Sequence, residues 1–133
     1  MLHSEYRSRY YGKKIDFDWA YGIQCVDSAR HYCSEMWFPI WSFWGSAINA
    51  WNTWAPFDDS WVRFTYKPWM APKQGNIVFW SEWRCTNGHV AVANKFCNQN
   101  VLRCFDENGT GHGDPTTPRF YDYKNVLGWF SKL

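Results

Sequence analysis

Residues 24–36 read QCVDSARHYCSEM and contain neither glycine nor proline. Side chains recur in this segment at the spacing of one helix face, which predicts an α-helix that begins at Gln24 or Cys25 and ends near Met36. A helix start presents unpaired N–H groups and partial positive charge, which stabilise a thiolate and an oxyanion formed beside it. Cys25 is therefore a candidate nucleophile.

The chain on either side of this helix has other patterns. Residues up to Lys14 form a polar, partly helical lead-in, a second helix is expected over 43–51, and the proline-containing segment 55–71 is expected to be irregular. Short apolar segments between turn residues then predict strands at residues 76–80, 89–94, 101–105, 120–123 and 126–130, with a loop at 109–118. Helices followed by an antiparallel meander predict an α+β fold, with N-terminal helices packed on the sheet.

The size and composition of the chain fit one folded domain. Its 133 residues are enough for a substantial core, and 46% hydrophobic and 22% aromatic residues exclude a disordered chain. The sequence contains neither an internal repeat nor a linker-like segment. We therefore expect a single domain over residues 1–133, without a separate binding module.

Charge and hydropathy exclude two classes of partner. The formal net charge is +2, and no basic run is longer than Lys13–Lys14, so the electrostatic footprint of a nucleic-acid-binding protein is lacking. No apolar stretch is long enough to insert into a membrane, and the N-terminus lacks the apolar core of a signal peptide. We expect synthesis in a cytoplasm, where the 5 cysteines stay reduced.

A thiol nucleophile needs a base that the fold brings beside it, however distant in sequence. His89 begins a predicted strand after the turn residues 86–88 and is a candidate for that base. A third polar group must orient the imidazole, and Asp106, Glu107 and Asn108 are available at the end of the next strand. Other histidines and cysteines compete for these roles, namely His31, Cys33 and His112.

The loop before the helix has the ligand spacing of a calcium site. Positions 1, 3, 5, 7 and 12 of an EF-hand loop are matched by Asp16, Asp18, Ala20, Gly22 and Asp27. Tyr21 replaces the usual glycine and Asp27 the usual glutamate, so the segment is not a helix–loop–helix EF-hand. The alternative is that the aspartates only cap and solvate a loop, with Asp27 complementing the helix dipole.

Motifs along most of the chain resemble, in the same order, those of the CHAP family (cysteine, histidine-dependent amidohydrolases/peptidases) found in phage endolysins. The matching segments are residues 16–27 around Cys25, 44–47, 72–79, 88–92 around His89, 106–108 and 128–130. The similarity extends from about Gly12 to Phe130. One departure is Asn76, which stands where the family often has aspartate.

This resemblance implies a papain-like or NlpC/P60-like fold and assigns roles to individual residues. Cys25 would be the nucleophile and His89 the general base. Asp106 would orient His89, with Asn108 as an auxiliary polar residue. The side chain of Gln24 would help to hold the oxyanion beside the backbone N–H of Cys25.

The third residue of this triad has a rival. Asp106 stands where relatives often carry the longer glutamate, which leaves Glu107 as an alternative partner of the histidine. Successive strand residues point to opposite faces, so Glu107 faces away from Asp106, whereas Asn108 shares its face. We therefore expect Asp106 to orient the imidazole.

The resemblance also extends to the metal loop. Calcium-binding CHAP lysins are similar here, which implies Ca²⁺ held by the side chains of Asp16, Asp18 and Asp27 and the carbonyls of Ala20 and Gly22. Because this loop leads directly into Cys25, a bound ion would brace the helix that carries the nucleophile.

The function implied is that of a peptidoglycan hydrolase, a phage endolysin or virion-associated lysin that cleaves an amide bond in bacterial cell-wall peptide. It would be a cysteine endopeptidase or an N-acetylmuramoyl-L-alanine amidase, a monomer made in the host cytoplasm and released to the wall or carried on the virion. One alternative is a non-enzymatic, calcium-stabilised wall-binding or virion structural module with the same fold. Another is a cytosolic thiol amidase or deubiquitinase-like protease.

Overall fold

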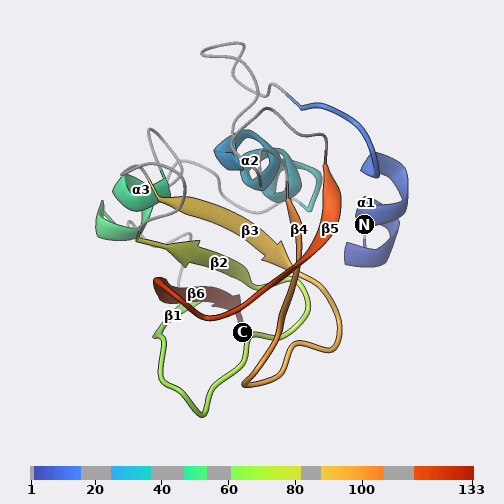
Figure 1. The fold of residues 1–133 in the computed structure, drawn as a ribbon. Helices are drawn as coiled ribbons and strands as arrows, with labels where there is room; N and C mark the ends of the chain where they lie inside the picture. The colour runs from blue at the N-terminus through green and yellow to red at the C-terminus, as the bar shows by residue number, and fades with distance from the viewer. Residues whose placement is uncertain (1, 16–24, 37–46, 54–60, 82–87, 107–115) are drawn as a thin grey trace.

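The structure, a computed structural model, describes residues 2–15, 25–36, 47–53, 61–81, 88–106 and 116–133. Within these ranges the helices are α1 (His3–Tyr10), α2 (Cys25–Glu35) and α3 (Ala47–Thr53). The strands are β1 (Trp61–Thr65), β2 (Ile77–Trp80), β3 (His89–Ala93), β4 (Leu102–Asp106), β5 (Thr117–Tyr121) and β6 (Val126–Lys132). Figure 1 shows α2 and α3 on one side of the sheet. None of the helices in the described ranges is long and apolar enough to cross a membrane.

The strands of the described residues form a 6-stranded antiparallel sheet in the order β1-β6-β2-β3-β4-β5. The α+β prediction, with N-terminal helices packed on an antiparallel sheet, is confirmed. The expected meander covers only β2 to β5. β6 returns to pair with β2, where Ile77 lies opposite Phe130, and β1 then adds to its other edge, where Trp61 lies opposite Lys132.

One strand was not predicted, and another begins earlier than predicted. β1 lies within the segment 55–71, which was expected to be irregular. The strand was missed because its pairing with β6 joins residues distant in sequence and because only Trp61 of the strand is buried. β5 begins at Thr117 rather than at residue 120, and it includes Pro118. Proline is tolerated there because β5 is the last strand of the sheet and pairs with β4 alone.

Both faces of the sheet are buried, and strand alternation divides its side chains between two clusters. The face toward α2 and α3 carries Ile77, Phe79, Val90, Val92, Phe105 and Phe130, which pack with Tyr32, Cys33 and Trp51 of the helices. The other face carries Val78, Trp80, Ala91, Leu102, Cys104 and Trp129, covered by tyrosines at 66, 121 and 123. α1 joins the first cluster through Tyr6, whose ring makes edge contacts with Tyr32 and Phe105.

The direction of α2 relative to β3 determines which residues meet. Cys25, at the start of α2, interacts with His89 at the start of β3. The hydroxyl of Tyr32, two turns later, lies beside Gly75, which hydrogen-bonds the end of β3 at Ala93. α2 and β3 therefore run in the same direction and begin at the same end of the domain.

Candidate active site

The three residues predicted to form a triad are each the end residue of an element. Cys25 is the first residue of α2, His89 is the first residue of β3, and Asp106 is the last residue of β4. Since β3 and β4 are antiparallel neighbours, the start of one lies beside the end of the other. The structure thus brings the three residues together although they are far apart in sequence.

His89 and Asp106 form a buried, charge-assisted pair. The imidazole Nε2 of His89 donates a hydrogen bond to Oδ2 of Asp106 at 2.5 Å. The two residues are each 1% exposed, so water does not compete for this contact. Of the candidates for a third polar group, Glu107 and Asn108 lie outside the described residues.

Cys25 and Asp106 together determine the protonation of His89. Burial alone lowers the pKa of His89, but the charge of Cys25, the hydrogen bonds to Asp106 and Cys25, and the charge of Asp106 raise it from 6.5 to about 10. Because Nε2 is bonded to Asp106, Nδ1 is the ring nitrogen left to face the sulfur. The imidazole therefore carries its proton at neutral pH and is ready to act as an acid.

Gly88 fixes the point at which the chain enters β3. Its φ of +75° is one that residues with a Cβ rarely adopt, and a Cβ there would lie 2.4 Å from the carbonyl oxygen of Trp80. Because β3 pairs tightly with β2 at this point, Trp80 lying opposite His89, only glycine fits before the histidine.

Three further side chains surround the His89–Asp106 pair. The hydroxyl of Tyr121 donates a hydrogen bond of 2.5 Å to Oδ2 of Asp106, and the Nε of Arg119 lies 3.6 Å from Oδ1. The indole of Trp80 is fully buried, and its centroid lies 5.3 Å from that of His89. Trp80 therefore packs against the imidazole and excludes water from it.

Sequence reasoning missed Arg119 and Tyr121 as neighbours of the site. β5 pairs with β4 so that Thr117 lies opposite Asp106, Arg119 opposite Cys104, and Tyr121 opposite Leu102. Alternation along 117–121 puts these three residues on one face of β5, and the register of β5 with β4 makes this the face of Asp106. The alternation was not recognised because the strand was expected to begin at residue 120, and the register is not visible in the sequence.

Of the predicted calcium ligands, the structure describes Asp27 alone. This residue is in the first turn of α2 and is fully buried. Asp16, Asp18, Ala20 and Gly22 lie outside the described residues, as does Gln24. The described part of the chain contains no group of 3 or more His, Cys, Asp or Glu side chains that could hold a metal ion. The calcium site stays a prediction.

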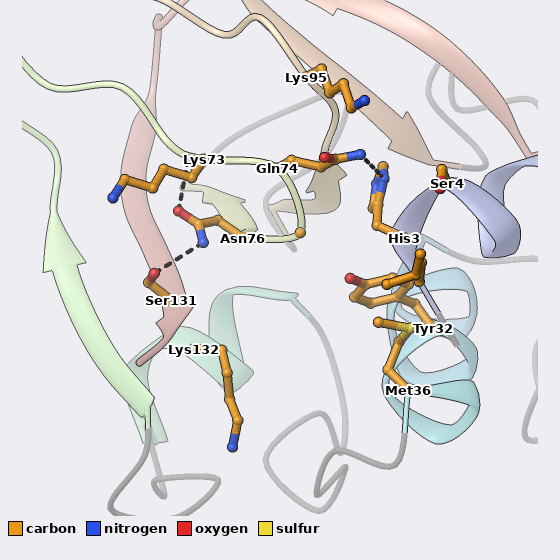
Figure 2. Close-up of a pocket in the computed structure, with 12 residues that line it drawn as sticks. His3, Ser4, Tyr32, Met36, Lys73, Gln74, Asn76, Lys95, Ser131 and Lys132 are labelled. Carbon is orange, nitrogen blue, oxygen red and sulfur yellow. Dashed lines mark hydrogen bonds between the residues drawn. The ribbon is translucent and has the colours of Figure 1, made fainter.

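Asn76, the noted departure from the family motif, uses both ends of its amide. Its Oδ1 accepts a hydrogen bond of 2.9 Å from the backbone N–H of Lys73, and its Nδ2 donates to Oγ of Ser131 at 3.0 Å. Figure 2 shows both bonds, which tie the turn before β2 to the end of β6.

A hollow of about 500 Å³ lies beside this turn, at the opposite end of α2 from Cys25. Its lining comes from the start of α1, the end of α2, the turn before β2 and the end of β6. Its lysines, Lys73, Lys95 and Lys132, point in different directions (Figure 2), so they do not converge on one anion. His3 beside them is uncharged at neutral pH, because burial, Arg7 and Lys95 lower its pKa to about 4.

The sequence of the chain is similar to that of a phage endolysin. The chain is 28% identical over 119 residues to the endolysin PlyTW of Staphylococcus phage Twort. The match covers 84% of this chain and 25% of PlyTW, so the chain spans about a quarter of that protein. No family model matches the chain.

Solved structures share the fold. The wild-type endolysin LysIME-EF1 superposes with a TM-score of 0.80 at 20% identity, over 98% of this chain and 62% of that one. Ly7917 superposes with a TM-score of 0.66 at 15% identity, over 99% of this chain and 63% of that one. Ly7917 with the hydrolyzing product of MDP gives a TM-score of 0.65 at 16% identity over the same shares. The chain is thus similar in sequence to a phage endolysin and shares its fold with the endolysin LysIME-EF1 and with Ly7917.

Proposed function

We propose that the chain is a CHAP-type catalytic domain that hydrolyses an amide bond in the peptide part of bacterial peptidoglycan, as an endopeptidase or an N-acetylmuramoyl-L-alanine amidase. The observation that carries this proposal is the contact of Cys25 with His89 and of His89 with Asp106 at one end of the domain. We also propose that the protein acts as a monomer, released from the host cytoplasm to the wall or carried on the virion.

The relatives support the choice of substrate. PlyTW is an endolysin, and Ly7917 has been crystallised with the hydrolyzing product of MDP. A Cys–His pair alone would fit many amidases, so the wall peptide is proposed from these likenesses and not from the pair itself.

The proposed reaction is acyl transfer through a thioester. The thiolate of Cys25 attacks the amide carbonyl, and the resulting oxyanion is held by N–H groups at the start of α2, with the Gln24 side chain as a helper. The tetrahedral intermediate collapses when the C–N bond breaks and the proton of His89 Nδ1 passes to the leaving amine. The now neutral His89 takes a proton from water, whose hydroxide cleaves the thioester to a carboxylic acid and restores the thiolate.

Asp106 is proposed to act on this reaction through His89. Its Oδ2 holds Nε2–H, which keeps Nδ1 turned toward the sulfur and stabilises the positively charged imidazole. Asn108 is proposed as an auxiliary polar residue on the same face, two positions later. Asp106 is therefore a positioning residue, whereas Cys25 and His89 exchange atoms with the substrate.

The bond that is cut can be identified by mass spectrometry of fragments released from purified peptidoglycan. A new amino terminus within the peptide or its bridge would identify an endopeptidase, and a free lactyl carboxylate on muramic acid would identify the amidase. Binding to the wall without release of any fragment would contradict hydrolysis and favour the non-enzymatic module.

A bound Ca²⁺ is proposed to stabilise the loop before α2, with ligands from the residues at 16, 18, 20, 22 and 27. The ion would neutralise the clustered carboxylates, and no bond-breaking step depends on it. The buried carboxylate of Asp27 in the first turn of α2 suits this role, because it would link the loop to the helix that carries Cys25.

We expect a chelator to lower both the melting temperature and the rate of wall hydrolysis, and added Ca²⁺ to restore them. An ion at a hundred times its Kd stabilises the folded state by about 2.7 kcal/mol. The Asp16→Asn variant should respond less to Ca²⁺ in differential scanning calorimetry. Equal melting temperatures and rates with and without chelator would remove the calcium site from the account.

A further inference from the structure

Oδ2 of Asp106 accepts two hydrogen bonds, one from His89 and one from Tyr121. We infer that Tyr121 is a positioning residue, whose hydroxyl fixes the Asp106 carboxylate in the orientation that holds the imidazole. The inference rests on the proposed function of Cys25 and His89. It adds a fourth member, on β5, to the predicted triad.

The geometry supports a fixed carboxylate. The terminal torsion of an aspartate is soft, so one hydrogen bond from His89 would leave the carboxylate free to rock. Tyr121 approaches Oδ2 from the neighbouring strand at 2.5 Å, and Asp106 is buried, so water cannot replace the hydroxyl. Two donors from different elements therefore hold a single oxygen.

Burial and the negative charge of Asp106 keep the hydroxyl of Tyr121 protonated, so that it donates to Oδ2. Burial, followed by the charge and hydrogen bond of Asp106, raises the pKa of Tyr121 well above its usual 10. Among the described residues, the titratable or charged groups that act on His89, Asp106 or Tyr121 from neighbouring positions include Cys25 from α2, Cys104 from β4 and Arg119 from β5. Arg119 adds positive charge at Oδ1, but at 3.6 Å its Nε is beyond hydrogen-bond distance, so it does not replace the tyrosine.

The ring of Tyr121 is held independently of its hydroxyl. Its centroid lies 5.3 Å from that of Trp80 in an edge contact and 6.1 Å from that of His89. Tyr121→Phe should therefore keep the packing of this face and remove the hydrogen bond to Asp106. Tyr123→Phe is the matched control, because its hydroxyl donates to the carbonyl of Asn98 instead.

The kinetic experiment compares these variants on soluble peptidoglycan fragments. We expect Tyr121→Phe to lower kcat about tenfold, the value of one hydrogen bond to a charged group, and to leave KM unchanged. Tyr123→Phe should match the wild type. In the Asp106→Asn background, Tyr121→Phe should change kcat by less than about twofold, since both changes act on the same contact.

A second readout does not depend on the substrate. The Nε2 proton of His89, held by a buried carboxylate, should give a downfield NMR signal that broadens in Tyr121→Phe and not in Tyr123→Phe. Unchanged kcat together with an unchanged signal would overturn the inference, and so would a full tenfold effect that persists in the Asp106→Asn background. If no variant, wild type included, hydrolyses the wall while the NMR signal behaves as expected, the proposed function fails and the hydrogen-bond role of Tyr121 stands.

Discussion

His89 receives its properties from neighbours on either side of its ring. Cys25 and Asp106 raise its pKa to about 10 against the lowering effect of burial. Asp106→Asn removes a charged acceptor and therefore lowers the pKa of His89. The imidazole of the variant therefore loses its proton at a lower pH than in the wild type. In the proposed mechanism that proton goes to the leaving amine, so hydrolysis should begin to decline at a lower pH than in the wild type.

The pH profile of hydrolysis of a soluble fragment checks this expectation. In Asp106→Asn the alkaline limb of kcat/KM should shift to lower pH. Asp122→Asn removes an exposed carboxylate that accepts a hydrogen bond from the N–H of Lys124, so it is the charge-matched control and should keep the wild-type limb. The same alkaline limb in both variants would contradict the role of Asp106.

Gly88 permits a separate test of how His89 is placed. Gly88→Ala combines a positive φ with a contact of 2.4 Å to the Trp80 carbonyl, whereas Gly12→Ala has a similar φ of +74° and nothing within 4 Å of the new Cβ. The strain at either position should cost about 1 kcal/mol, and the clash adds to it only at Gly88. Denaturant unfolding should show the larger loss in Gly88→Ala, and equal losses would mean that the β2–β3 contact is not as tight as described.

At the scale of elements, the predicted helix and strands were confirmed where the local pattern is strong. The helix beginning at Cys25 and the strands β2 to β4 follow from alternating or helical spacing bounded by turn residues. β1 could not be predicted, because its formation depends on β6, about half the chain away. The start of β5 was missed because Pro118 suggests a loop when its edge position is unknown.

The strength of the local pattern also decides which residues of the candidate site could be predicted. The residues Cys25, His89 and Asp106 follow from motifs and from strong local patterns, so their positions at element ends could be predicted. Tyr121 and Arg119 reach Asp106 through the register of β5, a long-range property that composition and spacing do not contain. The loop residues at 16–24 and 107–108 lie outside the described residues, and their roles stay predictions.

α1 is anchored on α2 through the side chain of Tyr6. Tyr6 is fully buried, and its hydroxyl lies 3.0 Å from Nδ1 of His31. Truncation to alanine should lower the free energy of unfolding by about 3 kcal/mol, as for other buried aromatic residues. Tyr11→Ala, at a residue that is 61% exposed, should change it by less than about 0.5 kcal/mol. Similar losses in urea titrations would show that α1 is not anchored through Tyr6.

For the whole molecule, the fold explains why residues at 25, 89 and 106 can act together. α2 lies over β3 (Figure 1). Both begin at one end of the domain, where β4 ends. The endolysin LysIME-EF1 and Ly7917 share this fold at 20% identity or less, so the fold tolerates extensive sequence change. The proposed catalysis thus depends on one sulfur, that of Cys25 at the start of α2.

The most direct measurement is the rate at which soluble fragments leave purified peptidoglycan, compared for the wild type, Cys25→Ala and Cys97→Ala. Cys97 is a free, half-buried thiol away from the triad, hydrogen-bonded within the β3–β4 turn, so its variant controls for loss of a cysteine. The account predicts a loss of more than about a thousandfold in Cys25→Ala and a wild-type rate in Cys97→Ala, with both variants folded by circular dichroism. A Cys25→Ala protein that releases fragments at the wild-type rate would contradict it.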